Sequence, residues 1–388
     1  MLYERLLKMD LPRGQSAFLW GARQEGKSTF LREHFPNSYM IDLLQTDVAL
    51  DYSKAPHLLR EQILAFDDDV LAYPIIIDEV QKVPALLDEI HWLIENTKAY
   101  FILCGSSARK LKRGAANLLG GRAWRFEFFP LVSAEIPQFD LLQAVKNGML
   151  PKIYPQKNAR RSLRAYITDY LKEEIQSEGL VQNLPVFARF LDSLAFSNGQ
   201  LTNYTNIARD CGIDSKTVKA YYQILVDTLI GYYVEPYSKK VGRNILTSVP
   251  KFYLFDVGVA NFIAKRQIAE LKGEAAGAAF EHFILLELIA YRSLMEQDFN
   301  IRYWRTKTGL EVDFILGEAQ IAIEVKISGN VDSRELTGLS AFIEEHQPKR
   351  AIVVSLDKKP RRLMRHGIKI EILPYQDFLT ALWAKKII

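Results

Sequence analysis

The stretch that decides the fold is Gly21-Ala22-Arg23-Gln24-Glu25-Gly26-Lys27-Ser28. It follows the pattern G-x-x-x-x-G-K-[ST], in which glycines let the backbone form a nest of N–H groups around a phosphate. Phe18-Leu19-Trp20 before it is typical of the end of a buried strand, and Ser28–Glu33 starts a helical pattern. The alternative is an ordinary glycine-rich turn. The strand–loop–helix context favours a phosphate-binding loop, because a helix N-terminus adds positive dipole at that point.

The same loop predicts which groups hold a nucleoside triphosphate. Lys27 is expected to reach the β- and γ-phosphates, and the Ser28 hydroxyl is expected to ligate Mg²⁺. We therefore expect ATP and Mg²⁺ as cofactors. The residues expected to bind the nucleotide are Gly21, Ala22, Arg23, Gln24, Glu25, Gly26, Lys27, Ser28 and Thr29.

A second strand is predicted at Tyr73-Pro74-Ile75-Ile76-Ile77-Asp78-Glu79. A β-branched apolar run of this kind suits a strand that is buried on both faces of a parallel sheet. Asp78 at its end is expected to hold the Mg²⁺, and Glu79 to orient and polarise the attacking water. Acidic strand ends are common, but together with the phosphate loop this one predicts a site that hydrolyses ATP.

A third apolar run, Tyr100–Cys104, ends in Gly105-Ser106-Ser107 and is expected beside the strand of Asp78. Ser106 or Ser107 would there sense the γ-phosphate or position the water; capping of a helix is the equal alternative. Arg122 and Arg125 are candidates for the arginine that is often supplied in trans during phosphoryl transfer. The alternative is that both arginines are ordinary surface residues exposed to solvent. A homo-oligomer is thus a further expectation.

The composition is that of a folded protein with several domains. The chain has 388 residues, of which 48% are hydrophobic, and this length exceeds one phosphate-loop domain. We expect domains at residues 1–150, 151–248 and 249–388. No apolar run approaches the ~20 residues that span a bilayer, so no membrane partner is expected. Two cysteines within apolar or helical patterns indicate a reducing, cytoplasmic location without disulfides.

The charge distribution leaves nucleic-acid binding open. The net charge is only +4, so composition alone does not require such a partner. Basic clusters fall at Arg109–Arg113, Arg160–Arg164 and Lys358–Arg365, and each is either a binding surface or a solvated face.

Residues 201–227 predict two helices around a tight turn at Cys211-Gly212-Ile213, with Asp214 or Ser215 as the cap of the second. The second helix has one apolar stripe, made of Val218, Tyr221, Tyr222 and Leu225. The opposite side presents Lys216, Lys219 and Gln223. A recognition helix uses such residues to contact DNA, so DNA is an expected partner. Leu229–Val234 is a candidate wing strand, and a protein-contact module is the alternative.

Side chains alternate in character, as in a strand, within two segments near the C-terminus, Gly309–Leu316 and Ile321–Ile327. They predict two strands joined by a four-residue hairpin loop. If Leu316 pairs with Ile321, then Asp313 lies opposite Glu324, and Glu311 opposite Lys326, on one face. Facing carboxylates destabilise a ladder, and a bound cation removes that cost.

The combination of Asp313, Glu324 and Lys326 on one face of the hairpin is what metal-assisted phosphodiester cleavage requires. Asp313 and Glu324 are expected to hold Mg²⁺, with Glu281 as a further ligand, and Lys326 to aid the attacking water. The alternatives are cross-strand ion pairs, such as Glu311 with Lys326, or a register slip that scatters the group.

Taken together, the motifs resemble prokaryotic AAA-like ATPases (AAA+ superfamily) that carry a C-terminal domain of unassigned function. The resemblance covers nearly the whole chain. It implies an α/β architecture: a P-loop parallel-sheet domain, a helical middle region with a winged helix, and a C-terminal domain similar to PD-(D/E)xK restriction-type nucleases. The carrying motifs are Gly21–Ser28, Ile77-Asp78-Glu79, Gly105-Ser106-Ser107, Leu119-Gly120-Gly121-Arg122, Phe129-Pro130-Leu131, Tyr253–Gly258, Glu311-Val312-Asp313 and Glu324-Val325-Lys326.

The resemblance also implies a nuclease motif made of Glu281, Asp313, Glu324 and Lys326. The chain departs from the PD-(D/E)xK pattern at one position, because Val312 instead of a proline precedes Asp313. The leading hypothesis is a Mg²⁺-dependent ATPase that acts on or near DNA, with metal-dependent nuclease activity as an open addition. The alternatives are a slow ATP-driven switch that holds protein partners, and an inactive nuclease-like domain that only grips DNA.

Overall fold

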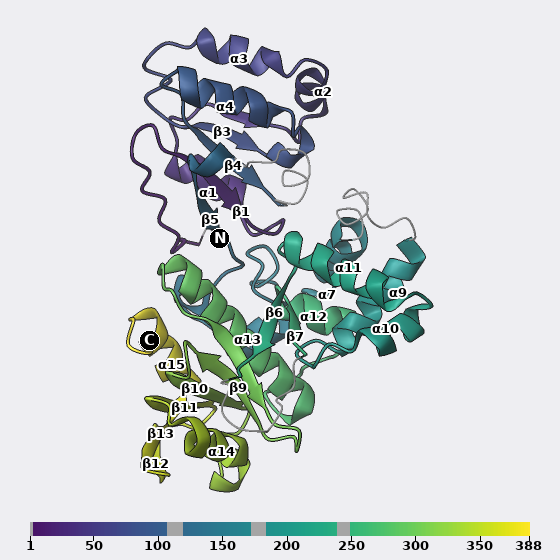
Figure 1. Cartoon of the computed structure of the whole chain (residues 1–388), viewed down its shortest axis with the longest axis vertical. Coiled ribbons are helices and arrows are strands. Elements are labelled where there is room, and N and C mark those ends of the chain that lie inside the picture. The colour runs from purple at the N-terminus through teal and green to yellow at the C-terminus, as the bar shows by residue number, and fades with distance from the viewer. Residues whose placement is uncertain (1–2, 107–118, 172–183, 239–248) are drawn as a thin grey trace. The chain divides into compact units, whose positions relative to one another are not determined.

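The computed structural model describes residues 3–106, 119–171, 184–238 and 249–388. The chain divides into two compact units (Figure 1). The N-terminal unit consists of Leu2–Pro130 with Ile224–Ile230, and the C-terminal unit of Leu131–Gln223 with Gly231–Ile388. No helix in the described ranges is long and apolar enough to cross a membrane. Cys104 and Cys211 are both buried and form no disulfide.

The N-terminal unit is built on a five-stranded sheet with the strand order β2-β3-β4-β1-β5. Every neighbouring pair in it is parallel. The strands are β1 (Ser16–Trp20), β2 (Met40–Asp42), β3 (Ile75–Asp78), β4 (Phe101–Gly105) and β5 (Ala123–Glu127). All residues of β1, β3 and β4 are buried, which confirms the strands that their apolar runs predicted.

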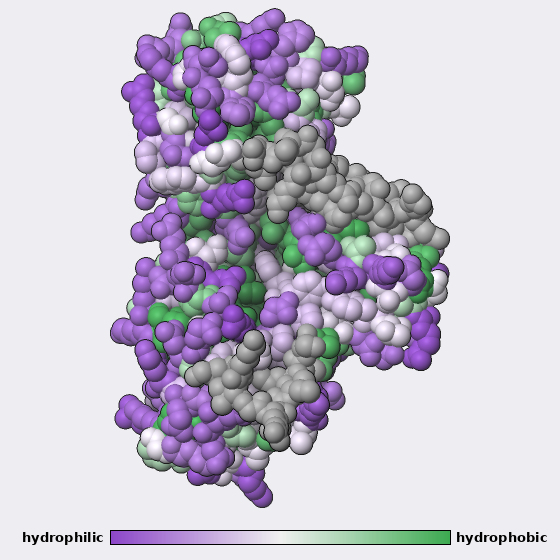
Figure 2. Space-filling view, viewed as in Figure 1, coloured by the Kyte–Doolittle hydropathy of each residue, from purple (hydrophilic) through white to green (hydrophobic). Residues whose placement is uncertain are grey.

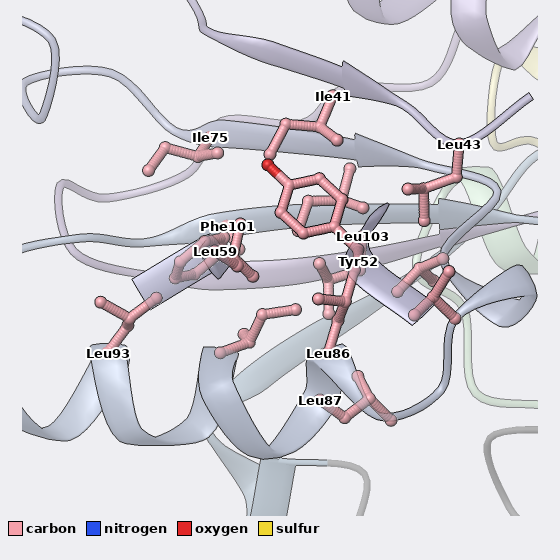
Figure 3. Packing of buried hydrophobic residues seen from close by; sticks show 14 of the residues in the cluster. Ile41, Leu43, Tyr52, Leu59, Ile75, Leu86, Leu87, Leu93, Phe101 and Leu103 are labelled. Carbon is pink, nitrogen blue, oxygen red and sulfur yellow. The ribbon is translucent and has the colours of Figure 1, made fainter. Parts of the chain in front are cut away.

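Helices cover this sheet. They are α1 (Lys27–His34), α2 (Thr46–Lys54), α3 (His57–Leu64) and α4 (Leu86–Asn96), with short 3₁₀ turns η1 (Val80–Lys82) and η2 (Leu119–Gly121). Figure 3 shows Leu59 of α3, Leu93 of α4 and Phe101 of β4 within one cluster of buried apolar side chains. The outer surface of this unit is mainly hydrophilic in the view of Figure 2. The helices thus cover the apolar sheet, and the polar loops lie at the ends of its strands.

The C-terminal unit begins with helices. They are α6 (Leu141–Asn147), α7 (Arg160–Ala165), the π-helical η4 (Tyr166–Leu171), α9 (Leu184–Phe196), α10 (Tyr204–Cys211), α11 (Ser215–Asp227) and α12 (Val257–Ile263), after a 3₁₀ turn η3 (Ser133–Glu135). The end of α11, from Ile224 on, belongs to the N-terminal unit. The predicted helix–turn–helix is present at α10 and α11. Gly212 has φ 68° at the turn, and Asp214 accepts hydrogen bonds from the backbone of Lys216 and Thr217.

The second helix of this pair has the predicted two sides. Its apolar stripe (Val218, Tyr221, Tyr222 and Leu225) is buried, while Lys216, Lys219 and Gln223 are exposed. A strand follows at Gly231–Pro236, two residues later than predicted. Antiparallel pairing joins it to a strand at Lys251–Leu254, and Leu201 forms a bridge to Lys251 from the other side.

An eight-stranded mixed sheet completes this unit, with the order β12-β13-β11-β10-β9-β8-β6-β7 among the residues described. Its strands are β6 (Gly231–Pro236), β7 (Lys251–Leu254), β8 (Ile301–Arg305), β9 (Glu311–Leu316), β10 (Ile321–Lys326), β11 (Arg350–Ser355), β12 (Arg361–Arg365) and β13 (Ile368–Pro374). Helices α13 (Gly273–Leu294), α14 (Thr337–His346) and α15 (Tyr375–Trp383), with the turn η5 (Ser333–Leu336), pack around it. The hairpin has the predicted register, because Ile321 pairs with Leu316.

A buried carboxylate, that of Glu287 in α13, ties three parts of the C-terminal unit together. It accepts hydrogen bonds from the backbone N–H and the hydroxyl of Ser133, both at 2.7 Å, and from the indole N–H of Trp383 at 2.7 Å. Burial raises the pKa of Glu287 to about 7, although these donors oppose the shift. The folded state therefore favours the protonated acid more than the unfolded chain does.

This raised pKa predicts that Glu287 contributes stability at low pH that is lost as the pH rises. The contribution is complete below the unfolded value of about 4.5 and disappears as the pH passes about 7. Denaturant unfolding of wild type and Glu287→Gln should be compared between about pH 5 and pH 8. Wild type should lose more stability over this interval than the variant, and parallel curves would contradict the linkage.

Candidate functional site

The glycine-rich loop connects β1 to α1 in the N-terminal unit. Gly26 has φ 100° and Gln24 has φ 63°, so the loop uses the left-handed backbone that glycine permits. Lys27 is buried, with 5% of its surface exposed. Its ammonium donates hydrogen bonds to the carbonyl oxygens of Gly21 (2.7 Å) and Ala22 (2.8 Å). The lysine thus folds back over the loop, onto neutral acceptors.

An arginine that the sequence analysis missed holds the loop from outside. The Arg5 guanidinium donates to the carbonyl oxygens of Glu25 (2.8 Å) and Phe129 (2.7 Å), and it lies 4.1 Å from the centre of the Phe128 ring. Gly21 lies so close to Phe128 that a β-carbon there would collide with it. Arg5 therefore fixes the loop against the segment that follows β5, and no motif around Arg5 signals this.

The expected metal-binding oxygens are adjacent. The Ser28 hydroxyl, in the first turn of α1, donates a 2.5 Å hydrogen bond to Asp78 Oδ2 at the end of β3. Asp78 is only 2% exposed. A hydroxyl and a carboxylate oxygen beside a buried ammonium form a donor set that fits Mg²⁺ bound to a phosphate. Thr29 and Gln24, which were also expected to contact nucleotide, are exposed.

Glu79 is the centre of a polar network next to Asp78. Its φ of 57° is unusual for a residue with a β-carbon and turns the chain sharply after β3. The side-chain amide of Gln81 donates to the Glu79 carboxylate and to Ser106 Oγ, the latter at 2.9 Å. Arg23 lies 3.8 Å from the Glu79 carboxylate on its other oxygen.

In this network Gln81, which the sequence analysis missed, links the predicted residues Glu79 and Ser106, and Arg23 lies beside Glu79. Ser106 follows β4, whose Cys104 pairs with Asp78, so the expected neighbourhood of Ser106 and Asp78 is present. A β-carbon on Gly105 would collide with Gln81. The only sequence signal for Gln81 is its position two residues after Glu79.

The arginine candidates lie on the surface of the N-terminal unit. The Arg122 guanidinium pairs with Glu95 of α4, and their side chains are 40% and 46% exposed. Arg125 is exposed as well. The structure leaves the trans role of either arginine as a prediction. Ser107 and the basic cluster at Arg109–Arg113 lie outside the described residues.

The C-terminal carboxylates come together around a lysine that the sequence analysis missed. The Lys251 ammonium, whose side chain is 4% exposed, pairs with Glu281 of α13 at 3.3 Å and with Glu311 of β9. Tyr253 donates a 2.6 Å hydrogen bond to Glu281, and Arg305 contacts Glu311 at 2.9 Å. Glu311 is therefore paired with Lys251 and Arg305, whereas Lys326 had been the partner considered.

The carboxylates of Asp313 and Glu324 each have one close polar neighbour, and Glu324 Oε2 is buried without a hydrogen-bond partner among the residues described. Asp313 accepts a hydrogen bond from the Val325 N–H at 2.7 Å, and Glu324 pairs with Lys326 at 2.6 Å. Burial, followed by the carboxylate of Glu324, raises the pKa of Asp313 well above its ordinary value. The uncharged form of Asp313 is therefore favoured.

Lys251 stays charged in this cluster. Burial by itself lowers its pKa, but the surrounding carboxylates, beginning with Glu281, raise it well above the ordinary value. The cations of Lys251, Lys326 and Arg305 contact the carboxylates of Glu281, Glu311 and Glu324, and burial raises the pKa of Glu324 as well. Within the described ranges, no three His, Cys, Asp or Glu side chains are arranged to hold a metal ion.

Comparisons with known proteins match residues 13–136 to a known domain type and leave the rest of the chain unassigned. Residues 13–136 match an AAA domain, which supports an AAA-like P-loop ATPase. Residues 138–270 and 276–378 match two domains of unknown function, DUF8612 and DUF4143. Uncharacterised proteins of Mycobacterium bovis and Mycobacterium tuberculosis are each 25% identical over 316 residues, which is 79% of this chain and 68% of the relative. These similarities support ATP binding and hydrolysis by the AAA domain.

The position of Lys251 predicts a large effect on stability. Lys251→Met removes the ammonium and leaves Glu281 and Glu311 with fewer partners, at a cost of about 3–5 kcal/mol. Lys272→Met is the matched control, because Lys272 pairs with Glu270 on the exposed surface; this pair should contribute little. Denaturant unfolding measures both variants. Equal stabilities would mean that the cluster does not depend on Lys251.

Proposed function

We propose that the protein is a Mg²⁺-dependent ATPase that acts on or near DNA. The ATPase part rests on the 2.5 Å hydrogen bond between Ser28 and Asp78. Ser28 directly follows the buried Lys27 in the glycine-rich loop. In this proposal Gly21–Thr29 bind the triphosphate and Ser28 and Asp78 hold Mg²⁺, which neutralises phosphate charge when bound. Lys27 exchanges its carbonyl partners for phosphate oxygens.

Glu79 is the proposed base that orients and activates water. Its carboxylate is held by Gln81 and lies near Arg23 and Ser106, so its position depends on all three. We propose that Gln81 and Ser106 aim Glu79 and that Arg23 restrains it until nucleotide attracts the arginine. Arg122 is retained as the arginine that a neighbouring copy would supply.

Two substitutions separate nucleotide binding from hydrolysis. Lys27→Ala should abolish ATP binding and turnover, because the buried cation that meets the phosphates is lost. Glu79→Gln should still bind ATP but hydrolyse it about 10²–10⁴-fold more slowly. Calorimetry with an ATP analogue and a phosphate-release assay measure the two effects.

The matched control is Lys82→Ala, an exposed lysine one residue after Gln81, which should behave as wild type. Retained turnover in Lys27→Ala would remove the assignment of the loop, and wild-type turnover in Glu79→Gln would remove Glu79 as base.

The DNA part rests on the helix–turn–helix. The order of α9, Leu201, α10, α11, β6 and β7, with β7 paired between Leu201 and β6, is what a winged helix requires, and we propose that fold here. Lys216, Lys219 and Gln223 would meet DNA. The three-part division at 1–150, 151–248 and 249–388 is proposed with it.

For the C-terminal domain we favour the inactive, nuclease-like alternative. Glu281, Asp313, Glu324 and Lys326 are the proposed nuclease motif, yet the buried cation of Lys251 already pairs with Glu281, and Lys326 pairs with Glu324. A metal ion bound by Glu281 and Glu324 would have to compete with these two ammonium groups. The domain would then bind DNA without cleaving it.

One assay tests the DNA role and the cleavage role together. Plasmid DNA added with Mg²⁺ or Mn²⁺ should raise ATP turnover, with a steep loss as salt increases, and should remain uncut. Lys216→Glu/Lys219→Glu should lower this stimulation, whereas the exposed pair Lys152→Glu/Lys157→Glu should not. Turnover indifferent to DNA favours the protein-binding switch. Cutting by wild type that Asp313→Ala abolishes would restore the active nuclease.

A further inference from the structure

A cavity of about 420 Å³ lies within the helical part of the C-terminal unit. Its walls come from α7, η4, α9 and α12 with the residues after it. All of these lie inside residues 138–270, the segment that matches a domain of unknown function. The glycine-rich loop belongs to the N-terminal unit, so this cavity is a separate place on the chain. Small-molecule sites generally have volumes of about 300–1,000 Å³.

Positive charge gathers around the cavity. Arg160 and Arg164 lie one turn apart on α7, Lys265 and Arg266 follow α12, and Asp192 is the one acidic residue among the lining groups that the structure describes. In the portion of the chain that the structure describes, none of these four cations forms an ion pair; Arg266 makes only a long hydrogen bond, 3.4 Å, to the carbonyl oxygen of Phe196. Like charges one helical turn apart repel. A concave surface concentrates that potential, and an anion would relieve it.

The floor of the cavity is apolar. Leu191 and Ile263 are buried there, and the half-buried ring of Phe262 lines the same space. The Arg160 guanidinium lies 6.0 Å from the centre of that ring. A ligand that fills this site needs a charged group for the rim and a flat or apolar part for the floor. A bare inorganic anion uses only the rim.

We propose that this cavity binds a nucleotide unit, with the phosphate held by Arg160, Arg164, Lys265 and Arg266 and the base packed against Phe262. Arginine recognises phosphate through paired N–H donors, and bases stack on aromatic rings in a sequence-tolerant way. The same chemistry is presented by a free mononucleotide and by one nucleotide of a single strand. This site goes beyond the proposed ATPase and does not require it.

The test uses the full-length chain carrying Lys27→Ala, so that the glycine-rich loop does not contribute to binding. Calorimetry with AMP, and fluorescence anisotropy with a labelled, 5′-phosphorylated oligothymidylate, measure affinity for the two sources. Arg160→Glu/Arg164→Glu should weaken binding at least about tenfold, since charged hydrogen bonds to phosphate are lost and repulsion is added. The matched control is Arg161→Glu, an exposed arginine of the same helix that does not line the cavity.

A second pair of measurements tests the floor. Phe262→Leu should weaken the binding of AMP more than that of inorganic phosphate, because only AMP carries a base. Tighter binding of AMP than of the oligonucleotide assigns a free nucleotide, and the reverse assigns a strand. Binding that Arg161→Glu lowers as much as the double variant would overturn the proposal, as would an absence of binding in a folded protein. ATP turnover of the double variant, measured with Lys27 intact, should be unchanged.

Discussion

The parallel pairing of β1, β4 and β3 is the constraint from which the nucleotide site follows. These strands are fully buried, so a change of register would move apolar side chains out of the core. Their pairing sets Trp20 beside Gly105 and Cys104 beside Asp78. The loop after β1, the serine after β4 and the carboxylates after β3 therefore meet at one edge of the sheet, where parallel strands generally bind ligands. The Ser16 hydroxyl, which accepts a 3.0 Å hydrogen bond from the Phe101 N–H, fixes the opposite end of the same pair.

The two polar clusters of the chain differ in what satisfies their charges. Lys27 contacts neutral carbonyl oxygens, which a phosphate outcompetes because its oxygens carry charge. Lys251 contacts the charged carboxylates of Glu281 and Glu311, and it is itself buried. A group that is already paired with an opposite charge gains little from an external ion, and breaking that pair is costly. The first cluster is thus prepared for a ligand, whereas in the second Glu281 and Glu311 already have a cation and Glu324 Oε2 is left without a hydrogen-bond partner among the described residues.

Local patterns in the sequence were sufficient for the elements and for part of the first site. The positions of the strands, the strand–loop–helix order around Gly21–Ser28 and the hairpin register depend on neighbours within a few residues. The structure has the strands within about two residues of their predicted bounds and confirms the register. Arg5, Gln81, Lys251 and Glu287 were missed for a common reason. Arg5 contacts Phe129, 124 residues away, and Glu287 contacts Ser133, 154 residues away. A single arginine or glutamate carries no sign of such a partner, because the contact exists only once distant elements have packed. Gln81 is local to Glu79, but its role depends on Ser106.

The pairing of arginines elsewhere in the C-terminal unit makes the cavity cations unusual. Arg361 pairs with Asp357 at 2.7 Å, and Arg350 with Glu371 at 3.0 Å, although both arginines are partly exposed. Around the cavity, Asp192 lines the same space as Arg160 and Arg164 and pairs with neither within the described residues. Folding alone does not favour such an arrangement, because uncompensated like charges destabilise the helix that carries them. Their repulsion is offset when an anion binds, and the apolar floor beneath them restricts which anions gain most. Cations that have no ion-pair partner among the described residues, above an apolar floor, are therefore better explained by a ligand than by stability.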